Sequence, residues 1–123
     1  MRLLYVAIGG ALGSAARYLV STEINRGTSP PSPGGTFVVN VTGCLVFGLV
    51  AGLAERRYPL SASTRAFLFV GVLGGFTTFS SFAYDTFLLL EQGQMLRAAA
   101  NAAGQVFVGL FALWAGYALL RVL

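Results

Sequence analysis

Histidine is absent from this 123-residue chain, and cysteine occurs only once, as Cys44. Without imidazole, the chain lacks the commonest proton relay and metal ligand of proteins. A single thiol excludes an intramolecular disulfide and a metal cluster built from thiolates. Charged residues make up only 10% of the chain, whereas a soluble domain carries roughly 25%. These absences leave enzyme chemistry little to work with and favour a membrane protein.

Long uncharged segments are what the sequence has in their place. Hydrophobic residues account for 56% of the chain, and charge-free runs cover residues 27–54, 66–84 and 98–120. A bilayer crossing needs roughly 20 mostly apolar residues, so each run predicts a span. A shorter apolar run at 3–16 resumes beyond Arg17 and gives a fourth. We therefore predict an all-α membrane protein with four transmembrane helices, over residues 2–23, 36–57, 64–91 and 95–121.

The first of these helices has an alternative interpretation. Arg2 precedes an apolar stretch that small residues follow, as in a cleaved signal peptide. Cleavage would leave three helices. The glycine spacing in GGALGSAA suits helix packing better than cleavage, so we expect the segment to remain as a helix.

The connections between the helices are short. The turn-rich loop GTSPPSPGG contains prolines that do not continue a helix, and Ser63 is the expected N-cap of the third helix. No linker is long enough to separate domains, so residues 1–123 are expected to form one domain. Four helices of about 20 residues enclose little interior, and a pathway is easier to build between two chains, so oligomerisation is expected.

The basic residues are all arginine, and their distribution sets the expected orientation. The N-terminal side carries five of them, against two or three on the other side, depending on where Arg17 is counted. This excess favours a cytoplasmic N-terminus only weakly, so the chain can insert both ways and two copies can pair antiparallel. The five are Arg2, Arg56, Arg57, Arg65 and Arg121; the opposite side has Arg26 and Arg97.

The stretch GGFTTFSSF, residues 74–82, predicts an interruption of the third helix. Two adjacent glycines followed by hydroxyl residues weaken helix propagation. Carbonyl groups exposed at a broken membrane helix can coordinate a small hard cation, and those of Gly74 and Thr77 are the candidates. The alternative is a kink whose backbone groups are satisfied by neighbouring hydroxyls.

A second group of residues has the chemistry to meet an anion. Asn40 lies deep in the second helix, one turn beyond Thr36, and its amide supplies two N–H donors. Phe79 and Phe82 share one helix face, and aromatic ring edges carry partial positive charge. The hydroxyls of Ser80 and Ser81 add donors. Taken singly, the asparagine is as well explained by a helix–helix hydrogen bond and the phenylalanines by packing.

Two charged residues lie near hydrocarbon, and two amides form a stripe on the last helix. Arg17 can concentrate anions in a vestibule, with Asp85 pairing with it or holding it; the alternative is a structural ion pair or snorkelling. Asn101 and Gln105 are one turn apart, and Gly109, the next turn on, adds no side chain.

The segments GGALGSAARY, GTFVVNVTGC and GGFTTFSSF, in this order across four short helices, resemble the CrcB/Fluc fluoride channel family. The resemblance covers nearly the whole chain. It implies an antiparallel dual-topology homodimer of the bacterial inner membrane, with two fluoride pores and one structural sodium ion on the dimer axis. Fluoride, a second copy of the chain and membrane lipid are the implied partners, and nucleic acid is not.

The resemblance also assigns residues. It implies a pore asparagine at Asn40 with Thr36 one turn before it, pore phenylalanines at Phe79 and Phe82, and a hydroxyl track at Ser80 and Ser81. Backbone carbonyls of Gly74 and Thr77 from both chains would hold the sodium ion. Family members often carry serine or asparagine where this chain has Gln105 and Gly109.

Passive conduction is the preferred mechanism, because the chain has neither histidine nor a carboxylate at the membrane centre to couple protons. A small multidrug-resistance-type antiporter also has four short helices, but it needs such a carboxylate, and Glu23 lies at the end of the first helix. A structural or assembly subunit that transports nothing is the third alternative.

Overall fold

The computed structural model of the chain describes residues 1–56 and 58–122, and every regular element in them is a helix. Helix α1 covers Arg2–Ile24 and α2 covers Pro33–Arg56. The third span consists of four pieces: α3 Ala62–Arg65, η1 Ala66–Leu73, α4 Gly74–Phe76 and α5 Phe79–Glu91. Helix α6 covers Met95–Val122. Four helical segments are long and apolar enough to cross a membrane, which confirms the predicted architecture.

Two helix starts differ from the sequence prediction. Helix α2 begins at Pro33 rather than at residue 36, because proline in the first turn of a helix loses no needed hydrogen bond and has a suitable φ. The third span begins at Ala62, and its N-cap is Ser61, whose Oγ accepts from the Thr64 N–H at 3.1 Å. The prediction of Ser63 as the cap was therefore wrong. The predicted end of the second helix near Arg57 lies outside the described residues.

The segment Ala66–Leu73 forms a π-helix, which the sequence did not predict. Its residues, AFLFVGVL, contain no proline and only one glycine, and they read as an ordinary membrane helix. π-Helical turns are rare in proteins, and those that occur often lie near functional sites. This one ends at the residue before α4, directly ahead of the interruption in the third span.

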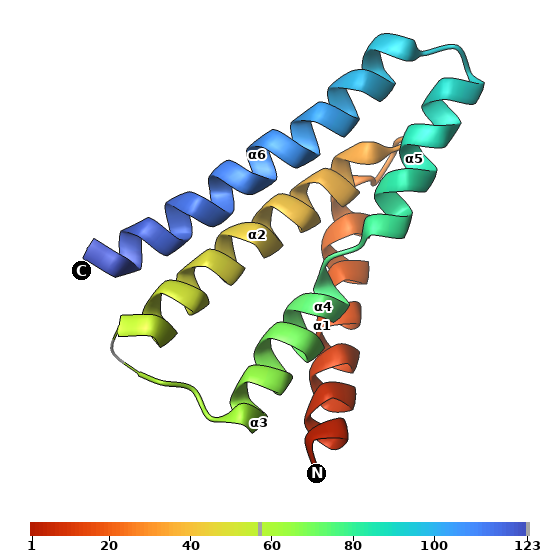
Figure 1. Cartoon of the computed structure of the whole chain (residues 1–123). Coiled ribbons are helices and arrows are strands. Elements are labelled where there is room, and N and C mark those ends of the chain that lie inside the picture. The colour runs from red at the N-terminus through yellow and green to blue at the C-terminus, as the bar shows by residue number, and fades with distance from the viewer. Residues whose placement is uncertain (57, 123) are drawn as a thin grey trace.

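Close helix contacts hold the fold together. Helix α2 packs along α6, and α1 packs against η1 and α4 (Figure 1). Small residues make these contacts possible: a Cβ atom on Gly48 would lie 2.0 Å from the Leu113 carbonyl oxygen, and one on Gly13 would lie 2.1 Å from that of Val72. The backbones therefore approach as closely as glycine allows, as in other membrane helix pairs.

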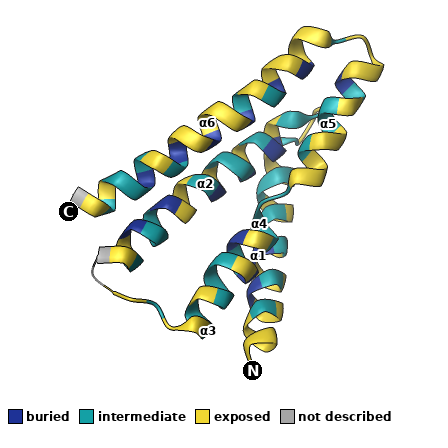
Figure 2. Ribbon diagram, viewed as in Figure 1, coloured by how far each residue is buried: buried dark blue, intermediate teal, exposed yellow. Residues whose placement is uncertain are grey.

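The outer faces of the helices are apolar and exposed, and few side chains are fully buried (Figure 2). The fully buried large side chains are Val39 and Leu89. Outward-facing leucine, valine and phenylalanine side chains are what a lipid environment or a second copy of the chain would cover. With its four spans, the chain is a multi-pass membrane protein.

Candidate functional site at the interruption of the third span

The third span is interrupted at Thr77 and Thr78. Both residues are extended, with φ/ψ of −78°/158° and −152°/114°. The predicted interruption is therefore present, but it begins after Phe76, and the glycine pair Gly74–Gly75 is still helical. Thr78 restarts the helix as the N-cap of α5: its Oγ1 accepts from the Ser81 N–H at 3.2 Å.

Asn40 of α2 binds both backbone groups of Thr78. Its Oδ1 accepts from the Thr78 N–H at 2.8 Å, and its Nδ2 donates to the Thr78 carbonyl at 3.0 Å. In an uninterrupted α-helix the N–H of residue 78 would donate to the carbonyl of Gly74. Asn40 thus takes the place of a helical hydrogen bond and leaves the Gly74 carbonyl without its usual donor. Asn40, the side chain that was predicted to meet an anion, therefore binds the backbone at the interruption of the third span.

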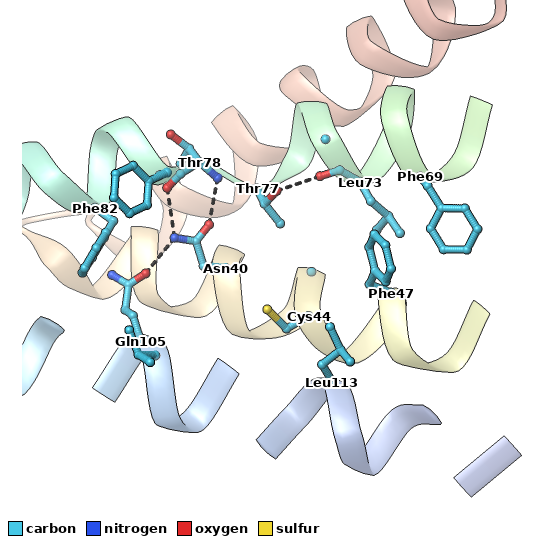
Figure 3. A pocket seen from close by; sticks show the side chains of 14 residues that line it. Asn40, Cys44, Phe47, Phe69, Leu73, Thr77, Thr78, Phe82, Gln105 and Leu113 are labelled. Atoms are coloured by element: carbon cyan, nitrogen blue, oxygen red, sulfur yellow. Dashed lines mark hydrogen bonds between the residues drawn. The ribbon is translucent and has the colours of Figure 1, made fainter. Parts of the chain in front are cut away.

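The Asn40 amide continues into a chain of polar side chains, which Figure 3 shows in part. Its Nδ2 also donates to Gln105 Oε1 at 2.7 Å, and Gln105 Nε2 donates to Asn101 Oδ1 at 3.2 Å. Asn101 Nδ2 donates to Thr86 Oγ1 at 2.9 Å, and that hydroxyl donates to the Phe82 carbonyl at 2.8 Å. We call these four side chains, Asn40, Gln105, Asn101 and Thr86, the amide relay. It joins α2, α6 and α5.

A cavity of about 350 Å³ lies beside the relay and is bordered by α2, η1, α5 and α6. Asn40, Gln105, Phe79 and Phe82 are among its lining residues, and so are Gly74 and Thr77. Figure 3 labels Asn40, Gln105, Phe82 and Thr77. The rings of Phe79 and Phe82 meet edge to face, with centroids 5.4 Å apart. Phe79 is 79% exposed, so its outer side is open in the single chain. The structure thus places the predicted asparagine, the two phenylalanines and the residues Gly74 and Thr77 around one cavity.

A second, smaller cavity of about 200 Å³ is lined mainly by hydroxyl groups and one charge. Arg17 supplies the charge, and its Nη1 donates to the Thr77 carbonyl at 3.3 Å. Thr36, Thr78 and Ser81 contribute hydroxyls. Thr78 borders both cavities, so both lie beside the interruption. Ser80 lines neither of these two cavities; its hydroxyl lies 3.4 Å from Thr78 Oγ1.

Arg17 and Asp85 do not pair with each other. Among the side chains that the structure describes, the one ion pair joins Arg26 to Glu23. Asp85 Oδ2 accepts instead from Thr36 Oγ1 at 2.8 Å, so it ties α5 to α2. Arg17 therefore binds the backbone of the interruption, and Asp85 holds α5 against α2.

The Thr36–Asp85 hydrogen bond gives a testable prediction. Thr36 is only 7% exposed, and hydrogen bonds to charged groups contribute roughly 1.5–3 kcal/mol. We expect Thr36→Val to lower the melting temperature in detergent, because the carboxylate loses its donor while the side-chain volume is kept. Thr36→Ser keeps the hydroxyl and is the matched control. Equal melting of the two variants would show that the bond adds no stability.

Sequence reasoning missed Thr78 and Thr86. Thr78 carried a usable signal, because threonine is a preferred N-cap and stands directly before a new helix. Thr86 carried none: its partner Asn101 is on another helix, and only the packing of α5 against α6 brings them together.

The fold and site define a small multi-pass membrane protein with a polar interruption in one span. The chain belongs to the CrcB-like family: the family described as "CrcB-like protein, Camphor Resistance (CrcB)" matches residues 4–117.

Curated relatives match the chain over almost its full length. The "Fluoride-specific ion channel FluC" of Nitrobacter winogradskyi is 49% identical over 98% of this chain and 96% of its own. The protein of the same name from Nitratidesulfovibrio vulgaris is 44% identical, over 94% and 93%. That of Flavobacterium psychrophilum is 41% identical, over 93% and 92%.

Proposed function

We propose that this chain is a fluoride channel of the bacterial inner membrane and that it conducts passively. The observation that carries the proposal is the cavity at the interrupted span, where Asn40, Gln105, Phe79 and Phe82 meet inside a membrane helix bundle. The choice of fluoride as the ion comes from the names of the curated relatives. A channel needs none of the catalytic groups in which the composition is poor, so the composition agrees with this proposal.

The residues of the two cavities suit a small, strongly hydrated anion. Arg17 raises the local anion concentration at the hydroxyl-lined cavity, where the Ser81 hydroxyl accepts from Thr78 Oγ1 and keeps its own hydrogen to replace water. Thr36 lines the same cavity, but its hydroxyl hydrogen is donated to Asp85. Ring edges of Phe79 and Phe82 present partial positive charge further along. Ser80, on the first turn of α5, is proposed as a further hydroxyl of the same track. This order gives the anion a partner at each step.

We further propose that the working unit is an antiparallel homodimer with dual topology and two pores. Phe79 is mostly exposed and the larger cavity is open on one side of the single chain, so a second copy would complete its wall. The small arginine bias allows insertion in both orientations. Membrane lipid covers the remaining apolar faces.

A structural sodium ion is proposed at the carbonyls of Gly74 and Thr77 from both chains. The residues fit such an ion, because the Gly74 carbonyl has lost its helical donor to Asn40. The Thr77 carbonyl accepts one hydrogen bond from Arg17 and keeps a second lone pair. Carbonyl oxygens are the ligands that hard cations prefer, and the bound charge would favour an anion nearby.

Fluoride efflux from liposomes tests the proposed function. Vesicles that contain the purified protein and are loaded with potassium fluoride are diluted into fluoride-free buffer, valinomycin lets potassium leave with the anion so that charge is balanced, and a fluoride electrode follows the release. We expect rapid release that does not depend on a proton gradient, and little release from chloride-loaded vesicles measured with a chloride electrode. Equal passage of chloride would reject selectivity, and release only when a proton gradient is applied would reject passive conduction.

A further inference from the structure

A third cavity, of about 680 Å³, lies between the end of α2 and the start of the third span. The start of α1, the end of α2 and α3 lie at the same end of the helix bundle (Figure 1). These are the ends of three membrane spans, so this end of the cavity lies at the level of the lipid headgroups. We call it the basic cavity, because Arg2 and Arg65 are among its lining residues.

The charged residues of the basic cavity leave an excess of positive charge. Arg2 and Arg65 are exposed, and among the described side chains neither forms an ion pair. Glu55 also lines the cavity, but its carboxylate accepts a hydrogen bond from the Tyr117 hydroxyl. Arg121 lies over the ring of the same tyrosine, 5.7 Å from its centroid. Two guanidinium groups therefore face the cavity, and guanidinium groups bind phosphate oxygens in a bidentate manner.

The interior of the basic cavity is apolar. Phe47, Phe69 and Val70 line it, and small alanine side chains of α2, α3 and η1 leave the space between the helices. Phe47 precedes Glu55 by eight residues on α2, so it lies about 12 Å deeper along the helix. The Arg65 guanidinium lies 5.7 Å from the centroid of the Phe69 ring. The cavity is thus charged at the membrane surface and apolar within the hydrocarbon.

We propose that the basic cavity binds an anionic phospholipid, with its phosphate on Arg2 and Arg65 and an acyl chain against Phe47, Phe69 and Val70. Basic pockets between transmembrane helices bind the headgroups of anionic lipids. The apolar walls alone would suit a second copy of the chain equally well, but the excess of positive charge favours the lipid. The site is separate from the proposed ion path, because Arg2 and Arg65 line neither cavity at the interruption.

Native mass spectrometry of the purified full-length protein tests the proposal, with dioleoylphosphatidylglycerol and dioleoylphosphatidylcholine as the probes. We expect the parent to bind phosphatidylglycerol about tenfold or more tightly than phosphatidylcholine, because each arginine near a headgroup contributes a factor of about five. Equal affinities for the two lipids would overturn the proposal without any variant. Displacement of phosphatidylglycerol by an equal concentration of inorganic phosphate would also overturn it, because phosphate has no acyl chain.

Arg65→Gln tests the contact with the phosphate. We expect its affinity for phosphatidylglycerol to fall by about fivefold, with no change for phosphatidylcholine. Arg26→Gln is the matched control, because Arg26 lies in the loop after α1 and does not line the basic cavity. Its affinity for phosphatidylglycerol should equal that of the parent. An equal loss from both variants would mean that the arginines attract lipid only as surface charge, which contradicts a defined site.

Ala66→Trp tests the contact with the acyl chain. Ala66 lines the basic cavity on η1, and an indole ring there would occupy the space of the chain. We expect about tenfold weaker binding of phosphatidylglycerol, whereas Ala99→Trp, at an exposed position of α6 outside the cavity, should bind like the parent. Unchanged binding by Ala66→Trp would overturn the proposal. If a second copy of the chain fills the cavity, Ala66→Trp separates the dimer and the parent shows no preference between the lipids, which also overturns it.

Discussion

Replacing Asn40 by aspartate is expected to abolish fluoride conduction while leaving the shape of the side chain unchanged. One carboxylate oxygen can still accept from the Thr78 N–H. The other would face the Thr78 carbonyl and Gln105 Oε1, two acceptors that both lose their donor. Unsatisfied buried groups cost about 1–3 kcal/mol each, and the new charge repels an anion, so we expect efflux to fall by about a hundredfold or more.

Asn25→Asp is the matched control for this substitution. Asn25 lies in the loop after α1, where its Oδ1 accepts from the Gly35 N–H at 2.9 Å, and a carboxylate preserves that bond. Its efflux should stay near that of the parent in the same liposome assay. Parent-like efflux from Asn40→Asp would mean that the clamp on Thr78 is not needed for conduction.

Gly13→Ala is expected to cause a large loss of stability for so small a substitution. An added Cβ would lie 2.1 Å from the Val72 carbonyl oxygen and 2.8 Å from the Phe76 nitrogen, both of them backbone atoms. Backbone cannot move aside as a flexible side chain does, so we expect a loss of about 3 kcal/mol. Because these contacts hold α1 against the segment just before the interruption, efflux should fall as well.

Gly10→Ala, on the same helix, is the control, because a Cβ there would meet nothing within 4 Å. Thermal unfolding in detergent compares the two variants with the parent, and Gly10→Ala should stay within about 1 kcal/mol of it. Equal melting of Gly13→Ala and the parent would contradict the close approach of α1 to the third span.

The four spans could be predicted from the length of the uncharged runs, and the interruption could be predicted from the low helix propensity of its residues. The residue at which the interruption begins could not be predicted. Glycine is a poor helix former in isolation, yet Gly75 is helical because its missing side chain lets α1 approach: a Cβ there would lie 2.7 Å from the Gly10 carbonyl oxygen. The helix ends one residue later, at Phe76, and Asn40 accepts the Thr78 N–H just beyond that end.

Asn40 shows what a sequence leaves open at a site. The sequence shows that Asn40 lies within a span and that its amide has two N–H donors. It leaves undecided whether these donors meet an anion or form a helix–helix hydrogen bond. The structure gives both donors protein acceptors, one on Thr78 and one on Gln105, and these partners come from distant parts of the chain. The same holds for Asp85: its partner is Thr36 of α2 rather than Arg17, and only helix packing decides this.

An experimental structure of the protein in a lipid bilayer, with fluoride and sodium present, tests the central claim most directly. We expect Thr77 and Thr78 to be extended, the Asn40 amide to bind the backbone of Thr78, and Phe79 and Phe82 to face the anion path. A continuous helix through residues 62–91, with both phenylalanines turned to lipid, would contradict the account.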